Sequence, residues 1–149
     1  MPILGQYPTG NFVPTFQFKV IIDGVGDPME GFTKVSEIKM EIETIEFRSG
    51  MDSGIRKSMG RLKCSDVTLE RPYQGLDEFY AWFETCTREH DKRTVWIEFL
   101  KPNGTDVVRK YALYGAFPKE WTLPSMDAGA SNIGIEKITM AAERALQLE

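Results

Sequence analysis

The stretch EFRSGMDSGIRKSMGRLKCSDVTLER, residues 46–71, joins two strand-like segments through about a dozen residues rich in Gly, Ser, Met and Arg. A hairpin turn takes about two to five residues, so the connection at residues 49–60 is too long to be a turn alone. From Arg48 to Lys63 there are five positive residues against one Asp, a balance of +4 in a chain whose formal net charge is −4. The sequence therefore predicts a long, basic loop between two strands.

The size and composition of the chain favour one globular domain. With 149 residues, 42% hydrophobic and 27% charged, we expect a single core across residues 1–149. The net negative charge disfavours nucleic-acid binding as the main function. The N-terminus lacks a basic segment followed by an apolar run, and no apolar run approaches the roughly 18 residues of a membrane span. We therefore expect synthesis in the cytoplasm without a signal peptide, and no membrane segment.

Alternating apolar and polar residues predict that most of the chain is β-strand. Residues 1–15 lack any periodicity and contain three prolines, which favours an extended N-terminal arm. Residues 16–23 alternate cleanly, and residues 94–100 and 107–117 form a hairpin by their turn residues. Residues 133–142 complete the set as a final strand. About six strands and one helix predict a mainly β, antiparallel domain with the helix covering one opening or one face.

Residues 35–48 form a predicted strand whose apolar face changes halfway. Ile38, Met40 and Ile42 are expected to face the core, whereas Ile45 and Phe47 are out of phase with them. A slip of one residue indicates a β-bulge or a change of packing partner, and residues 61–71 show the same slip. The polar residues expected to point outward are Lys39, Glu41 and Glu43.

One segment, residues 75–89, has the spacing of an amphipathic helix. Its apolar residues recur at i, i+3, i+4 and i+7, and acidic residues precede Arg88 as the helix dipole favours. The residues predicted to form the helix core against a sheet are Leu76, Phe79, Tyr80 and Phe83.

The residue types that carry catalysis or bind metals do not form a recognisable pattern here. Cys64 and Cys86 lack metal-ligand spacing and are expected to be buried, reduced thiols, while His90 lies in a charged segment and is expected to be solvated. Glu41 and Glu43 share a strand face, as a general acid/base pair could, but a solvated polar face is the preferred interpretation. We therefore expect no catalytic residue, no metal and no cofactor, and a structural or binding protein.

The order of several short motifs resembles one protein family along nearly the whole chain. The motifs are VIIDG (20–24), GFTKVSEIKMEIETIEFRSG (31–50), MGRLKCSDVTLER (59–71), LDEFYAWF (76–83), YALYGAFPKEW (111–121) and NIGIEKITMAAE (132–143). In this order and spacing the sequence resembles the tail tube proteins of contractile phages and phage-like contractile injection systems, which are related to the type VI secretion tube protein.

The resemblance implies an antiparallel β-barrel or sandwich with one capping helix, assembled into hexameric rings. The rings stack into an inner tube that a contracting sheath drives through a target envelope. The implied partners are further copies of the chain, the sheath protein around the tube, baseplate and tail-terminator components, and cargo or DNA in the lumen. The chain would then be a structural subunit of a phage tail or injection particle.

In this family the long loop reaches the neighbouring ring, which assigns a role to residues 49–60. The inter-ring contact residues are predicted to be Ser49, Gly50, Met51, Asp52, Arg56, Lys57, Met59 and Arg61. Lys39, Glu41 and Glu43 are candidates to line the lumen, where an acidic wall would repel DNA or acidic cargo. Three alternatives remain: a low-copy baseplate or tube-initiator protein of the same fold, a monomeric effector-binding or chaperone module, and a surface loop without a partner.

Overall fold

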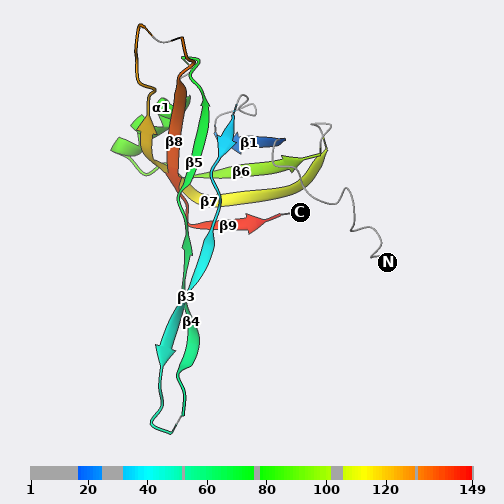
Figure 1. The fold of residues 1–149 in the computed structure, drawn as a ribbon, viewed down its shortest axis with the longest axis vertical. Helices are drawn as coiled ribbons and strands as arrows, with labels where there is room; N and C mark the ends of the chain where they lie inside the picture. Colours follow the sequence, from blue (N-terminus) through cyan, green and yellow to red (C-terminus); the bar gives the residue numbers. More distant parts are fainter. Residues whose placement is uncertain are drawn as a thin grey trace.

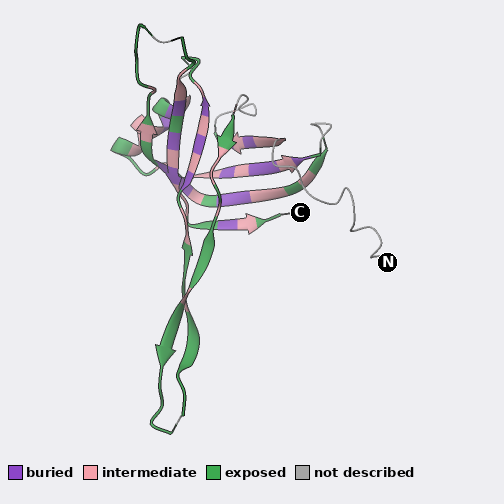
Figure 2. Cartoon of the chain, in the orientation of Figure 1, coloured by how far each residue is buried: buried purple, intermediate pink, exposed green. Residues whose placement is uncertain are grey.

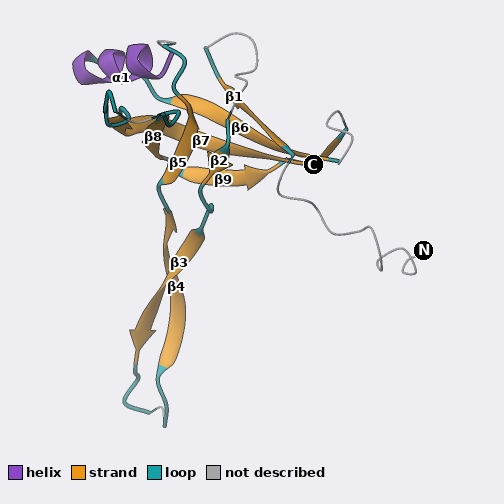
Figure 3. Ribbon diagram, turned by 45° about the horizontal axis from the view of Figure 1, so that its top comes forward, coloured by secondary structure: helices purple, strands orange, loops and turns teal. Residues whose placement is uncertain are grey.

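The computed structural model describes residues 17–24, 32–51, 53–75, 78–101, 106–129 and 131–148. The predicted N-terminal arm therefore lies outside the described residues. Within these ranges the predicted mainly β class with one helix is confirmed (Figure 3). In chain order the elements are β1 (Phe18–Ile22), β2 (Lys34–Val35), β3 (Met40–Phe47), β4 (Arg56–Cys64), β5 (Val67–Pro72), α1 (Glu78–Arg88), β6 (Arg93–Leu100), β7 (Val107–Thr122), β8 (Ile135–Ala141) and β9 (Arg144–Gln147).

Seven strands form one antiparallel sheet in the order β1-β6-β7-β8-β5-β2, and β9 adds to β7. The path ends at β1 and β2, so the described strands do not close the barrel that the family resemblance implies. Strand β7 is 16 residues long and links two parts of the sheet: its first part pairs with β6 and β9, and its last part pairs with β8. Figure 1 shows β7 turning sharply between these two directions.

The bend of β7 requires a glycine. Gly115 has a φ of +64°, a conformation that residues with a Cβ rarely adopt. A Cβ at this position would also collide with the carboxylate of Glu143. Gly115 therefore allows one long strand to serve two sheet directions.

The core lies between the sheet and helix α1, which packs against β7 (Figure 2). Val67 and Leu69 of β5 and Ile138 and Met140 of β8 alternate inward with no exposed surface. Such alternation is what one buried sheet face dictates. The largest buried aromatic side chain is Trp82, whose Nε1 donates a hydrogen bond of 2.9 Å to the carbonyl of Asp91.

The helix turns a different face to the core from the one its sequence favoured. Phe79 is fully buried, but Phe83 is only half-buried and the assignment of Tyr80 to the core is wrong, because its side chain is 45% exposed. Leu76 lies outside the described residues. The buried side is completed by Trp82 and by Cys86, which packs against the core cluster. The face that packs on the core therefore runs through Phe79, Trp82 and Cys86 and not through Phe79, Tyr80 and Phe83, because the indole of Trp82 fills more of the core.

A charged pair is buried beneath the helix. The Nε of Arg71 donates a hydrogen bond of 3.2 Å to Oε1 of Glu136, and both side chains are 1% exposed. Trp121 donates to the other carboxylate oxygen at 2.9 Å, and the Arg71 guanidinium lies 4.1 Å from the ring centre of Phe79. The Nη2 of Arg71 also donates a hydrogen bond of 3.5 Å to Oε2 of Glu78 on the helix, and no buried side-chain polar atom of the described residues lacks a partner. The pair therefore connects β5, β8 and the helix without leaving an unpaired buried charge.

Candidate assembly interface

Strands β3 and β4 form a separate two-stranded sheet that projects from the body of the molecule along its long axis (Figure 1). We call residues 40–64 the arm. At its root, the backbone N–H of Lys39 donates to Oγ of Ser65 at 3.0 Å, and the N–H of Ser65 donates to the carbonyl of Lys39 at 2.8 Å. These two bonds hold the strands together where they leave the body.

The predicted loop at residues 49–60 is shorter than its sequence suggested. Phe47 pairs with Arg56 and Thr44 with Met59, so residues 56–60 belong to strand β4. Only residues 48–55 connect the two strands. The prediction failed because Gly, Ser and basic residues are poor strand signals, while cross-strand pairing on a long hairpin tolerates them at solvent-exposed positions.

The predicted β-bulge is confirmed, and the extra residue lies on β4. Because the register shifts between Ile42 and Thr44, Glu43 faces two residues of β4, Gly60 and Arg61. Gly60 permits a close approach, since a Cβ there would lie 3.1 Å from the Cβ of Glu43. A bulge adds twist to a hairpin and changes the face that its side chains present.

The arm exposes apolar side chains. Met40 is 44% and Ile42 is 53% exposed, so the expectation that they face this domain's core is wrong. Ile38, which precedes the arm, does pack against the core. The reason is that the arm leaves the body after residue 39 and that, beyond its root beside β9, no other layer of the described chain covers it. The further apolar residues exposed on the arm are Ile45, Phe47, Met51, Ile55, Met59 and Leu62.

This exposed surface has the properties of a protein–protein contact. Contiguous exposed apolar patches on a soluble protein mark interaction sites. Each strand of the arm also pairs only with the other in the described chain, so both outer edges are available for pairing. An isolated two-stranded hairpin is marginally stable in water. The arm therefore has both the surface and the need for a partner.

The polar residues predicted to line the lumen lie on the arm or beside its root, and they are paired. The Nζ of Lys63 lies 2.8 Å from Oε1 of Glu43. This hydrogen bond and the charge of Lys63 lower the pKa of Glu43, and the same contact raises the pKa of Lys63. Lys39 lies 4.0 Å from Glu41. A lysine therefore lies beside each of these two carboxylates, and lumen lining stays a prediction.

The predicted inter-ring residues lie together at residues 49–61 of the arm, the part that we call the distal arm. Ser49, Gly50 and Met51 lie in the connection, where Met51 is 95% exposed. Asp52 lies outside the described residues. On β4, exposed positions are held by Arg56, Lys57, Met59 and Arg61. Met51 and Met59 were predicted on the exposed surface of the arm, whereas Ile45, Phe47 and Ile55 were not, although the change of phase at Ile45 and Phe47 was a signal for them.

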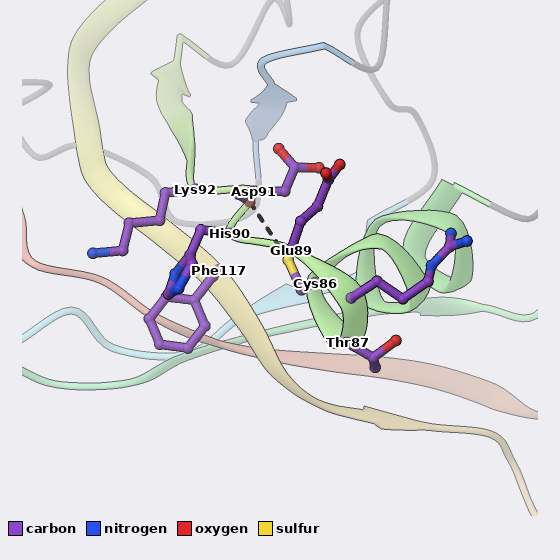
Figure 4. A pocket seen from close by; sticks show the side chains of 8 residues that line it. Cys86, Thr87, Glu89, His90, Asp91, Lys92 and Phe117 are labelled. Carbon is purple, nitrogen blue, oxygen red and sulfur yellow. Dashed lines mark hydrogen bonds between the residues drawn. The ribbon is translucent and has the colours of Figure 1, made fainter.

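Neither cysteine has the environment of a reactive site. Figure 4 shows a hollow at the end of helix α1, where Cys86 donates a hydrogen bond of 3.5 Å to the carbonyl of Asp91. Burial raises the pKa of Cys86, and burial likewise raises that of Cys64, so both thiols stay protonated near neutral pH. Both are free and partly buried, and His90 is exposed. Among the described residues no group of side chains could hold a metal ion.

In the part of the chain that the structure describes, no helix has the length and apolar character to cross a membrane.

The fold is that of components of contractile injection systems. A chain of the sheath–tube complex of PVC, an extracellular contractile injection system in its extended state, matches with a TM-score of 0.82 and 24% identity over 99% of both chains. A chain of the anti-feeding prophage cap, which terminates the AFP tube, matches with a TM-score of 0.80 and 29% identity over 99% of this chain and 95% of that one. Hcp1 from Flavobacterium johnsoniae has a TM-score of 0.57 at 14% identity, over 89% of this chain and 94% of that one.

The sequence itself identifies the family. The profile of the T4-like virus tail tube protein gp19 matches residues 14–145. The chain belongs to this family of tail tube proteins, which confirms the resemblance seen in the sequence, and it is a structural tube protein. A comparison with curated protein sequences gives no match.

Proposed function

We propose that this chain forms homohexameric rings that stack, through the arm, into the inner tube of a contractile injection machine. The observation that carries the proposal is the arm itself, a two-stranded sheet whose apolar side chains are exposed and whose outer edges are unpaired in the described chain. Together with membership of the tail tube family, this surface favours self-assembly over a monomeric chaperone or effector-binding module.

The body of the molecule offers separate surfaces for closing a ring. Strands β1, β2 and β9 each have a single partner strand in the described chain, so each leaves one edge open. Exposed edges invite pairing with another chain. A contact between unlike edges closes into a ring when its rotation fits, whereas an axial contact that never closes produces a filament. Sheet edges therefore suit the ring, and the arm suits the stack.

The positive charge of the distal arm would set the register of the stacking contact. Arg56, Lys57 and Arg61 are exposed residues of β4. Opposite charge on a neighbouring ring would steer the arm into one orientation, because charge complementarity sets specificity more than affinity. Such pairs are screened over about 8–10 Å near physiological ionic strength, so stacking should weaken with salt.

The remaining partners follow from the position of a tube in such a machine. The tube would lie inside a sheath, end at a baseplate and at a terminator, and hold cargo or DNA in its lumen, with Lys39, Glu41 and Glu43 as candidates for the lumen wall. The AFP baseplate structure also contains a chain of this fold, at 18% identity and a TM-score of 0.69, so a low-copy position at an end of the tube stays the alternative.

A double charge reversal tests the proposal. Arg56→Glu with Lys57→Glu should leave folded rings that no longer form tubes, as seen by negative-stain microscopy and circular dichroism. The matched control reverses two exposed charges away from the arm, Arg88→Glu with Lys101→Glu, and should assemble normally. Normal tubes from the arm variant would show that its charge is incidental. A wild-type chain that remains a 17.0 kDa monomer at every concentration and salt level would overturn the proposed function.

A further inference from the structure

A groove of about 750 Å³ lies beside the root of the arm. One side of it is formed by β1, β6, β7 and β9, which run across the direction of β5 and β8 (Figure 1), and the other side by residues 33–38 and Met40. Proteins bury bound groups in hollows of about 300–1,000 Å³, so this groove can hold several side chains. Its larger apolar side chains are Phe18, Val35, Ile38, Ile97, Phe99 and Tyr111.

The polar side chains of the groove are largely engaged within the domain. The hydroxyl of Tyr111 donates a hydrogen bond of 3.2 Å to Oε1 of Gln147, and Oγ of Ser36 accepts one of 2.8 Å from a backbone N–H of β5. The two charged side chains of the lining, Lys34 and Glu37, have opposite signs. The groove therefore carries no net charge, and its apolar wall is the surface that an occupant would bury.

The N-terminal segment of the chain has the composition of a buried segment. Residues 1–16, MPILGQYPTGNFVPTF, precede β1 and lie outside the described residues. They include no Asp, Glu, Lys, Arg or His, although 27% of the chain is charged and 16 residues would then hold about four charged side chains. Solvated tails are typically poor in apolar residues and rich in charge. The larger apolar residues of the segment are Ile3, Leu4, Tyr7, Phe12, Val13 and Phe16.

The N-terminal segment joins the domain at the wall of the groove. The carbonyl of Gln17 accepts a hydrogen bond of 3.0 Å from the N–H of Leu100, which fixes the chain beside the end of β6. The next residue, Phe18, lines the groove. Sixteen residues span at most about 50 Å when extended, so the whole groove is within reach. A short tether gives an effective concentration of the order of millimolar, which favours this segment over the same segment of a second copy in dilute solution.

From these observations we propose that the N-terminal segment docks in the groove of its own chain and covers the apolar wall. The occupant is apolar and uncharged, the groove is apolar without net charge, and the two are joined at Gln17. Burial of apolar side chains supplies the favourable free energy. The tail tube family match begins at residue 14, so most of the segment lies outside it. With the groove covered, the arm is the larger apolar surface that a subunit exposes, which limits non-specific contacts before assembly.

Alkylation of a cysteine in the groove tests the proposal. In the full chain with Cys64→Ser and Cys86→Ser, the substitution Val35→Cys places one thiol in the groove. With the native segment this thiol should react slowly with iodoacetamide. Adding Ile3→Asp with Leu4→Asp should raise the rate by about tenfold or more, because burial of one such side chain already corresponds to about tenfold in an equilibrium constant.

Two controls isolate the apolar contact. Gln6→Asp with Asn11→Asp adds the same charge at polar positions of the segment and should leave the groove thiol protected. Glu89→Cys, in place of Val35→Cys, puts the thiol at an exposed position near the end of helix α1, where it should react equally with every form of the segment. The milder Ile3→Ala with Leu4→Ala should raise the rate at Val35→Cys in the same direction, and it replaces the aspartate pair if circular dichroism shows that the aspartates unfold the domain.

Co-expression identifies which chain supplies the segment. The chain with Val35→Cys, Ile3→Asp and Leu4→Asp is produced together with an excess of the cysteine-free chain that has the native segment. Docking within one chain predicts that the thiol stays reactive. Protection restored by the second chain would assign the groove to a neighbouring copy and overturn the proposal. Equal rates with the native and the substituted segment would overturn it as well. Neither result changes the proposed tube function, which rests on the arm.

Discussion

Replacing Phe79 by alanine tests the position of helix α1 on the sheet. Phe79 is fully buried, its ring centre lies 5.6 Å from that of Phe32, and the guanidinium of Arg71 lies 4.1 Å from it. Truncation of a buried Phe costs about 3–5 kcal/mol, as transfer free energy plus the cavity left behind. Against a total stability of about 5–15 kcal/mol this is a large fraction. It should lower the melting temperature by about 6–20 °C in a domain of this size.

The matched control is Tyr80→Ala, which removes an aromatic ring from the neighbouring helix position. Tyr80 is 45% exposed and lies 5.0 Å from the ring centre of Trp121, so its loss should cost about 0.5–1.5 kcal/mol. Urea unfolding followed by circular dichroism measures both, at several dilutions, because assembly stabilises the folded chain by mass action. A loss below about 1 kcal/mol for Phe79→Ala, or an equal loss for the two variants, would refute this orientation of the helix.

Two further predictions concern the arm and the bend of β7. The contact with Lys63 lowers the pKa of Glu43, so its stabilising effect on the arm is present above the ordinary pKa of a glutamate and is lost as pH falls through the lowered value. An NMR titration should show that Lys63→Met raises the pKa of Glu43, whereas an unchanged value would mean that the pair does not form in solution. Gly115→Ala should destabilise the domain by more than about 1 kcal/mol, since φ there is +64°. Unchanged urea unfolding would show that the bend tolerates a Cβ.

The helix shows what periodicity does and does not determine. Its existence and extent were predicted from one apolar stripe, and the structure places a helix at Glu78–Arg88. The sequence could not decide between two overlapping stripes, one through Tyr80 and Phe83 and one through Trp82 and Cys86. The choice depends on the space that the sheet offers, because an interior is packed to crystal-like density and admits one arrangement of large side chains. The buried Arg71–Glu136 pair was also missed, because its partners are 65 residues apart and only the folded sheet brings them together.

In the arm, by contrast, the local signal predicted the bulge correctly, but the apolar residues around it were expected in the core and are exposed. The change of phase in residues 35–48 predicted a bulge, and the register shift confirms it. The predicted bounds of the loop, 49–60, were wrong because exposed strand residues do not need strand-forming side chains when cross-strand hydrogen bonds hold them.

The arm exposes apolar side chains on both of its faces, and this has a physical consequence for assembly. Successive side chains of a strand point to opposite faces, so Met40 and Ile42 lie on one face of β3, and Ile45 and Phe47 lie on the other. All four are between 44% and 53% exposed. A single covering layer cannot bury both pairs, and near the root Met40 already accepts a hydrogen bond of 3.2 Å from the backbone N–H of Ala145. We therefore expect Ile42→Asp, near the body, and Phe47→Asp, near the tip, to disturb different contacts. Analytical ultracentrifugation with microscopy would distinguish rings from tubes for each variant. The same defect from both would contradict two covering surfaces.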